Sequence, residues 1–147
     1  MSVVAYDVNT FLKADSTLQT LAGKTTSSPM DIFPIIGYGS SGVSGYDVPF
    51  MVYIWEPLDL GVEQYWNRAD LVRYTIYDSD ADRCFKMSNR LIALLGKGDS
   101  VSQSGGVTSS ANRIHSSRLI DSFTEEPVEK EGWYTVILTF ELIYNVL

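Results

Sequence analysis

The stretch from Ala69 to Leu95 limits the possible folds of this chain more than any other, because a strand there runs directly into an amphipathic helix. Residues 71–77 are rich in β-branched and aromatic types, which favour a half-buried strand. The next segment places its apolar side chains on one helical face: Ala81, Cys84, Phe85, Leu91, Ile92 and Leu95, widened by Met87 and Leu94, with Ser88 as a small polar member. Gly96 is the expected helix end. Such a helix gains most of its stability by packing that face on a sheet.

Three alternating aspartates, Asp78, Asp80 and Asp82, separate this strand from the helix. Their spacing imitates the first half of a calcium-binding loop, but Arg83 stands where that loop requires glycine and Asn89 where it requires glutamate. Aspartate also caps the free N–H groups at a helix N-terminus. We therefore predict helix capping here and no metal site.

The sequence pattern of the N-terminal part predicts two short helices and then a strand. Residues 6–12 have the pattern of a short helix, and Asp15 with Ser16 is typical of a cap on a second one, which Gly23 ends. Residues 50–55 are apolar on both faces, so we expect a strand that is covered on both sides. The amphipathic helix provides one cover, and a neighbouring subunit is a candidate for the other.

Two more strands are predicted in the C-terminal half. Residues 133–146 alternate clearly, and one face holds Tyr134, Val136, Leu138, Phe140, Leu142 and Tyr144. Residues 113–124 alternate weakly, with Ile114, Ser116, Arg118, Ile120 and Ser122 on one side. Helices that are separated from paired strands indicate an α+β fold. We predict one domain over residues 1–147: a mostly antiparallel four-stranded sheet, the amphipathic helix on one face, a short N-terminal helix, and long loops at 24–49 and 97–112.

The segment 24–49 is too long and too apolar for a simple linker. Loops of this length without structure are uncommon in compact domains and are usually functional or disordered. From its aromatic and aliphatic side chains we predict an arm that docks on a partner through Phe33, Ile35, Ile36, Tyr38 and Tyr46. A second candidate partner surface is an acidic connection that could bind a cation or a basic partner, or be a solvated turn: Glu125, Glu126, Glu129 and Glu131.

The charge of the chain argues against a surface that grips nucleic acid. The net charge is −7, whereas such surfaces are basic. Residues 1–67 carry seven acids and two bases, 68–124 six acids and eight bases, and 125–147 five acids and one base. This asymmetry can draw the acidic part of one copy to the basic part of another, although an ordinary solvated surface explains it equally well. Neither a membrane span nor a signal peptide is expected from the sequence. Cys84 lies on the apolar face of the predicted helix, so we expect its thiol to be buried and inert.

The sequence contains no complete catalytic or metal-binding set, so we expect no enzyme and no cofactor. Residues 37–42 match the dinucleotide pattern G-x-G-x-x-G, but the residues after Gly42 do not start a helix convincingly. A small-ligand or nucleotide-binding domain at Gly37–Gly42 stays open as a second hypothesis. A hydrolase centred on His115, the only histidine, is a third, although no nucleophile-elbow motif is present.

The order of these motifs resembles the tail-terminator or tail-completion proteins of long-tailed bacteriophages. The family's A-D-x-x-L-x-x-L-x-G helix ending is matched from Ala14 to Gly23, and its P-[FY]-h-V-Y strand (h is apolar) by residues 49–53. Its strand of the type h-x-I-[FY]-[DS], which runs into an amphipathic helix, is matched by residues 74–78 and the helix to Leu95. A last strand with alternating aromatics is matched by residues 133–144. The long loops, Trp55 and Trp66 depart from the pattern.

The resemblance implies a virion protein of the tail or neck, assembled in the host cytoplasm. Members form a ring of identical subunits, usually six, which caps the tail tube, stops its growth and docks to the head connector. The resemblance thus implies a homo-oligomer whose partners are the tail-tube protein and a connector or neck protein. An acidic ring would also let DNA pass through its lumen without specific binding, because phosphates are repelled. Within the same structural class, another neck or head–tail joining protein or a tail-tube subunit is the alternative.

Overall fold

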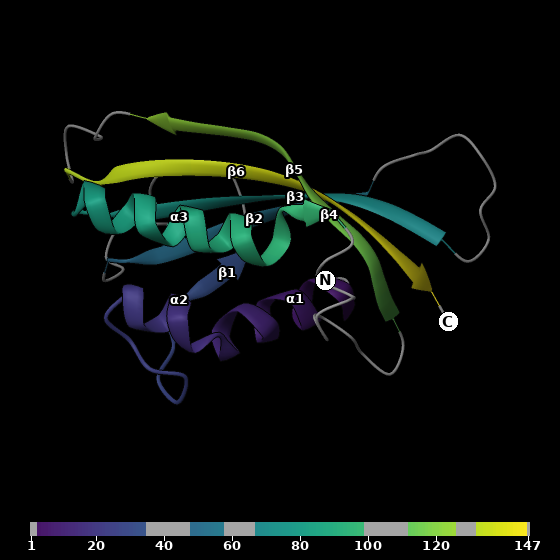
Figure 1. Cartoon of the computed structure of the whole chain (residues 1–147), viewed down its shortest axis with the longest axis horizontal. Coiled ribbons are helices and arrows are strands. Elements are labelled where there is room, and N and C mark those ends of the chain that lie inside the picture. Colours follow the sequence, from purple (N-terminus) through teal and green to yellow (C-terminus); the bar gives the residue numbers. More distant parts are fainter. Residues whose placement is uncertain (1–2, 35–47, 58–66, 99–111, 126–131, 147) are drawn as a thin grey trace.

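The protein folds as a single curved sheet with helices on one side. The computed structural model describes residues 3–34, 48–57, 67–98, 112–125 and 132–146. In chain order the elements are α1 (Val3–Ala14), α2 (Ser16–Leu21), β1 (Ile32–Pro34), β2 (Phe50–Pro57), β3 (Asn67–Asp78), α3 (Ala81–Leu95), β4 (Lys97–Gly98), β5 (Asn112–Glu125) and β6 (Tyr134–Val146). Figure 1 shows α1 and α2 beneath the sheet and α3 alongside them.

The six strands are arranged in the order β1-β2-β3-β6-β5-β4. All neighbouring pairs are antiparallel except β1 and β2, which run parallel. The predicted α+β class is confirmed, and the four long strands are the four that the sequence indicates. The two short edge strands were not predicted: β1 lies inside the 24–49 loop, and β4 opens the 97–112 loop. Strands of two or three residues are too short to produce a recognisable alternation of side chains.

One apolar core lies between the helices and the sheet. The predicted inward face of β6 is confirmed from Val136 to Tyr144 but not at Tyr134, which is 39% exposed; the buried side chains are Val136, Leu138, Phe140, Leu142 and Tyr144. They face buried side chains of β3 and of the three helices, which are Ala5, Val8, Leu12, Leu18, Val72, Tyr74, Ile76, Cys84, Met87, Leu91 and Leu95. Because β3 and β6 pair along twelve residue positions, this core extends along most of the sheet.

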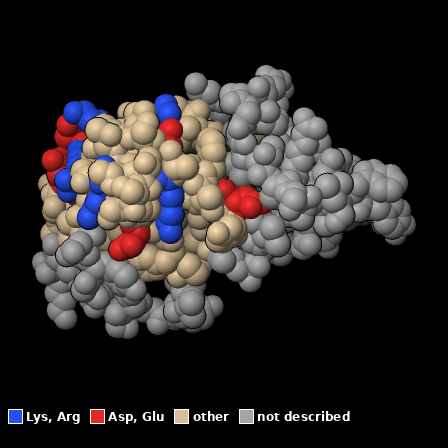
Figure 2. Space-filling model, turned by 90° about the horizontal axis from the view of Figure 1, so that it is seen from below, with Lys and Arg blue, Asp and Glu red and all other residues tan. Residues whose placement is uncertain are grey.

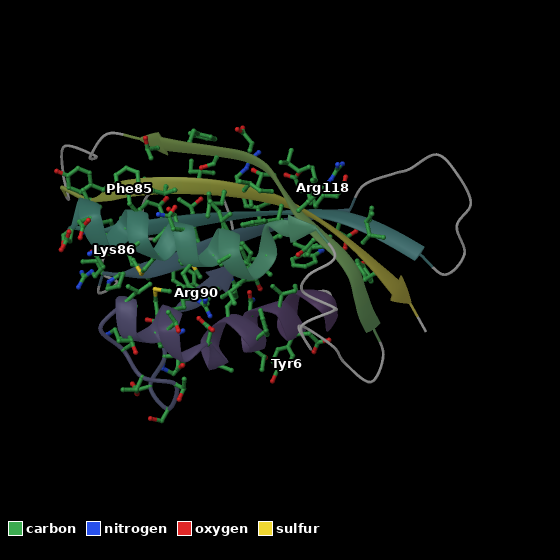
Figure 3. All side chains as sticks on the ribbon, in the orientation of Figure 1. Tyr6, Phe85, Lys86, Arg90 and Arg118 are labelled. Carbon is green, nitrogen blue, oxygen red and sulfur yellow. The ribbon has the colours of Figure 1, made fainter. Side chains whose placement is uncertain are left out.

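The buried face of α3 differs from the predicted one at Phe85. This ring is 49% exposed, whereas Met87 and Ser88 are buried. The side chains that enter the core follow the helical spacing of Cys84, Met87, Ser88, Leu91 and Leu95, which places Phe85 about 100° away from Cys84 around the helix axis. Figure 3 labels Phe85 on the flank of α3. A large apolar residue on this flank is therefore left for solvent or a partner.

Polar caps set the helix ends as the sequence predicts. Asp80 is the N-cap of α3, and its carboxylate accepts a hydrogen bond from the Arg83 N–H at 3.2 Å. Asp15 is the N-cap of α2, where its carboxylate accepts from the Leu18 N–H at 2.8 Å. The turn after α2 uses Gly23 at φ +72°, a conformation that glycine adopts without strain. The capping interpretation of the Asp78–Asp82 segment is confirmed.

The alternation predicted for residues 113–124 is wrong in detail, because β5 contains two irregularities. The register against β6 shifts between Ile114 and Ser116 and again between Leu119 and Asp121. Each shift inserts an extra residue, and the residues beyond it change faces. As a result Ser116 and Ser122, predicted on one face, pair with Ile143 and Leu138 on opposite faces of β6. Ser117 is buried, and Ile120 at the second shift is 48% exposed.

The face of the sheet opposite the helices is partly covered by aromatic side chains of the chain itself. Phe50 is fully buried there, with its ring centroid 5.0 Å from Tyr77, 5.3 Å from Trp133 and 5.9 Å from Phe33. Val52 on the same face is also fully buried. The expectation that a neighbouring subunit covers β2 is therefore wrong at these positions, because the same chain covers them.

Candidate functional site

The predicted partner-interface residues are not gathered into one site by the described residues. Phe33 lies in β1, where its ring stacks on Phe50 at an interplanar angle of 18°, so it packs within its own chain. Glu125 ends β5 opposite Thr135. The remaining predicted residues lie outside the described part of the chain: Ile35, Ile36, Tyr38, Tyr46, Glu126, Glu129 and Glu131. The same is true of the glycine pattern at residues 37–42. His115 lies in β5 at the first register shift.

One open edge of the sheet belongs to β5. Within the described part of the chain, the outer side of β5 is paired only at Ser117 and Arg118, where β4 forms a short antiparallel pair. From Leu119 to Glu125 no described strand pairs with that side. Two large apolar side chains of this stretch are exposed, Ile120 by 48% and Phe123 by 44%. An unpaired strand edge with exposed apolar side chains is a ready site for another polypeptide.

Two more exposed aromatic rings lie toward the same end of the sheet. Tyr134 begins β6 and is 39% exposed, and Phe85 is on the first half of α3. The two segments adjoin, since the Cys84 sulfur lies 3.9 Å from the Tyr134 carbonyl oxygen. Thr135, the next residue of β6, pairs in register with Glu125 of β5. Phe85 and Tyr134 therefore lie on the helix side of this end of the sheet, whereas Phe123, which pairs with Ile137, lies on the opposite face.

The opposite side of the molecule has a groove between α1 and the edge strand β1. It has a volume of about 210 Å³ and is lined by Tyr6, Asn9, Thr10, Lys13, Ile32, Pro34 and Tyr53. The α1 residues follow the spacing i, i+3, i+4 and i+7, so they form one flank of the helix. The neighbouring flank, with Ala5, Val8 and Leu12, is fully buried in the core. Tyr6 at the rim is 61% exposed, and Figure 3 shows it pointing away from the sheet.

Hydrogen bonds beneath α1 fix the inner wall of this groove. The buried Tyr74 hydroxyl donates to the Asn9 side-chain oxygen at 3.0 Å. Burial raises the pKa of the Tyr53 hydroxyl, and a hydrogen bond with Asn9 opposes this shift in part. Both tyrosines are therefore neutral near pH 7. These contacts hold α1 against β2 and β3, so the inner wall of the groove is fixed by hydrogen bonds within the fold.

Basic and acidic side chains are paired and dispersed. Four bases each contact a carboxylate: Arg83 with Asp78 at 2.6 Å, Lys86 with Asp82 at 2.7 Å, Arg90 with Asp15 at 2.8 Å and Arg118 with Glu141 at 2.9 Å. Figure 2 shows basic and acidic residues side by side on a largely uncharged face. On the face seen there, no continuous basic patch is present among the described residues. This arrangement suits protein contacts better than tight binding of phosphate backbones.

Reactive groups in the described part of the chain are few. Cys84 is fully buried, and desolvation raises the pKa of its thiol to about 11. The described residues hold no cluster of three or more histidine, cysteine or acidic side chains placed to bind a metal ion. None of the described helices is both long and apolar enough to span a membrane. The features that stand out are therefore the two edges of the sheet.

Comparisons with known proteins find similarity among solved structures. No protein-family model matches the sequence, and no curated protein is significantly similar to it. Among solved structures, the chain is similar to a chain from the "Virion of native gene transfer agent (GTA) particle", with a TM-score of 0.66 and 14% sequence identity. The chain shares its fold with a virion component. The match covers 99% of both chains, so the likeness extends over the whole domain.

Sequence reasoning missed the groove, although part of its signal was present. The spacing of Tyr6, Asn9, Thr10 and Lys13 is visible in the sequence as a polar and aromatic flank of the first helix. Its other wall comes from β1, which is three residues long and pairs parallel with β2. A parallel pairing between segments that are close in sequence leaves no local signal, so the groove could not be assembled from the sequence.

Proposed function

We propose that this chain is a structural virion protein that forms a ring of identical subunits, caps the tail tube, ends its elongation and joins the tail to the head connector. The observation that carries the proposal is the match over the full length of a chain from a gene transfer agent virion at a TM-score of 0.66. The motif order that resembles tail-terminator proteins supports the specific role within the particle.

The surface of the domain is suited to assembly. Ring subunits need two different contact surfaces, because each copy contacts one neighbour on each side. This chain has an open, partly apolar strand edge at β5 and a groove beside the opposite edge strand, β1. Both surfaces belong to one rigid sheet, so the angle between successive copies would be fixed by the fold.

The electrostatics also favour a channel through which DNA passes. The chain carries a net charge of −7, and four of its bases pair with carboxylates in the described region. A ring of such subunits repels phosphates and does not hold the DNA that passes through it. In the proposed role, the partners are a tail-tube protein on one side of the ring and a connector or neck protein on the other. The location is then the virion tail or neck.

Tail-tube assembly in vitro tests this function. Tube subunits encoded by the same genome are polymerised with and without the purified chain, and tube lengths are measured by electron microscopy. The proposal predicts that the chain binds at one end of each tube and that added chain stops further growth. Tubes that elongate equally in its presence would contradict a terminator role. Polymerisation of the chain by itself into tubes would identify a tube subunit, and binding to the connector alone would identify a neck protein.

A further inference from the structure

The exposed large apolar side chains of the described residues lie at the two sides of the sheet. Ile120 and Phe123 are on β5, with Phe85 and Tyr134 nearby on the same half of the molecule. Tyr6 is on α1 at the opposite side, at the rim of the groove beside β1. In Figure 3 Tyr6 and Phe85 project from different ends and different layers of the molecule. The chain thus has two separate surfaces with exposed apolar side chains, one a strand edge and the other a groove.

The groove has the size and lining to receive an aromatic ring. An apolar protein cavity of about 150 Å³ binds benzene, and this groove measures about 210 Å³. Ile32 and Pro34 provide one wall, and Tyr6 and Tyr53 add aromatic surface. Pro34 has no N–H, so it cannot extend hydrogen bonding along β1 to another strand. The groove is therefore better suited to receiving side chains than to continuing the sheet through backbone pairing.

The two surfaces carry opposite charges that form no ion pair among the described residues, although the Asp121 carboxylate accepts a hydrogen bond from the Ser122 N–H at 2.8 Å. Lys13 lines the groove at the last turn of α1, and Asp121 is exposed on the free stretch of β5. Neither side chain forms an ion pair with a described residue. Opposite charges at the rims of two apolar surfaces favour encounter in one orientation. A cationic groove and an anionic strand edge on the same chain point to a second copy as the occupant.

We propose that the free edge of β5 in one copy docks in the α1–β1 groove of the next, with Ile120 or Phe123 in the groove and Asp121 beside Lys13. The inference rests on the ring-forming function proposed above and names the contact that builds the ring. Because the two surfaces differ, the contact is head-to-tail, and repetition around a symmetry axis closes a ring.

Disulfide trapping tests this contact directly. The variant that carries both Lys13→Cys and Asp121→Cys is oxidised mildly and run on a non-reducing gel. Positions 13 and 121 lie at opposite sides of the sheet, where β1 and β5 are four strand spacings, or about 19 Å, apart. A bond within one copy is thus excluded, because disulfides need Cα atoms within about 7 Å. We expect a ladder of dimers, trimers and higher multimers that ends at the ring size.

The single variants Lys13→Cys and Asp121→Cys are the matched controls. Each carries one accessible thiol, since Cys84 is fully buried, so oxidation can link two copies at most. Mixing the two single variants must give a heterodimer and no larger product. A ladder from either single variant, or none from the double variant while the wild-type chain forms rings, would overturn the proposed contact.

Charge reversal gives a second and independent readout. Lys13→Glu or Asp121→Lys places like charges in contact and should weaken self-association at least about tenfold in sedimentation experiments. The variant that carries both Lys13→Glu and Asp121→Lys restores opposite charges and should recover most of the wild-type association. Equal weakening in the double variant would contradict the pairing of these two residues.

The failures of this contact and of the ring function are distinguishable. If wild-type rings cap tail tubes but the double-cysteine variant gives no ladder, the ring is built through other surfaces and the proposed function stands. If the wild-type chain neither forms rings nor binds tube ends, and no ladder appears on oxidation, both proposals fail together.

Discussion

Arg90 on α3 contacts Asp15, the N-cap of α2, through two parallel hydrogen bonds. Its Nη2 lies 2.8 Å from Oδ1 and its Nε 2.9 Å from Oδ2. The Asp15 side chain is only 14% exposed and also accepts from the Leu18 N–H. One carboxylate therefore starts α2 and ties it to α3, although the two residues are 75 positions apart in the sequence. Because α1 and α2 are joined at this point, the contact helps to hold the helix that forms the groove.

Removing the Asp15 carboxylate should destabilise the protein. Asp15→Ala loses a helix cap and a bidentate ion pair, and we expect a loss of about 1–3 kcal/mol in urea unfolding at pH 7. Asp15→Asn keeps most of the capping and should lose less. Asp82→Ala is the matched control, because its pair with Lys86 is on the surface and should contribute little. Equal losses in Asp15→Ala and Asp82→Ala would contradict this role.

The same pair predicts a dependence of stability on pH. The hydrogen bonds from Arg90 hold the pKa of the Asp15 carboxyl below its ordinary value. The folded state therefore binds the proton less tightly than the unfolded state, so the stabilisation is complete above about pH 4 and disappears as the pH falls through the folded pKa. The difference between wild type and Asp15→Asn should be constant from pH 5 to 8 and shrink below pH 4. A difference that grows on acidification would contradict the assignment.

Arg83 compensates a fully buried carboxylate at the start of α3. Its Nε and Nη2 each lie 2.6 Å from an oxygen of Asp78, whose side chain is 0% exposed. Arg83→Met leaves that charge without its partner and should cost about 2–3 kcal/mol, less than a fully buried pair, because Arg83 is one-third exposed. Arg83→Lys keeps the charge but loses the planar pair of donors, so an intermediate loss is expected in denaturant unfolding.

Gln19 joins the loop after α2 to the end of α1. Its side-chain amide donates to the Leu12 carbonyl at 3.2 Å and accepts from the Met30 N–H at 2.7 Å, and the residue is fully buried. Gln19→Ala leaves the buried Met30 N–H without its acceptor, while the Leu12 carbonyl keeps its hydrogen bond from the Asp15 N–H at 3.2 Å, so a cost of about 1–3 kcal/mol is expected. Thr20→Ala, at an exposed position of the same helix, is the control. Similar midpoints of urea unfolding for the two variants would show that the bridge does not contribute to stability.

The thiol of Cys84 should be inert in the folded protein. Desolvation in the core, with a smaller contribution from Asp78, raises the pKa of the thiol to about 11. At pH 8 the thiolate fraction is then more than about 100-fold below that of an ordinary cysteine. We expect labelling with a thiol reagent only after addition of denaturant. Rapid stoichiometric labelling in native buffer would contradict the burial of this residue.

The long elements could be predicted from the sequence because their patterns are local. The strand that runs into α3, the caps at Asp15 and Asp80 and the alternation in β6 each depend on residues close together in the chain. Phe85 was misplaced because the apolar stripe of α3 is broader than the face that the sheet covers. The register shifts in β5 could not be foreseen, since an inserted residue changes faces without changing composition.

The candidate contact surfaces were harder to predict than the fold. The sequence directed attention to the apolar segment around Phe33, whose ring instead packs on Phe50 within the same chain. The groove needs α1 and β1 side by side, and the open edge needs the strand order of the whole sheet. Both depend on contacts between residues far apart in sequence, which a single sequence does not specify. The order of the motifs nevertheless predicts a virion protein, and the shared fold with a chain of a virion particle agrees with that prediction.

Electron microscopy of the purified chain bound to tail tubes of the same particle tests the central claim most directly. The account predicts a closed ring with a central hole, seated at one end of each tube and built from identical copies in contact around it. Isolated single copies, with tube ends that carry no added density, would contradict it.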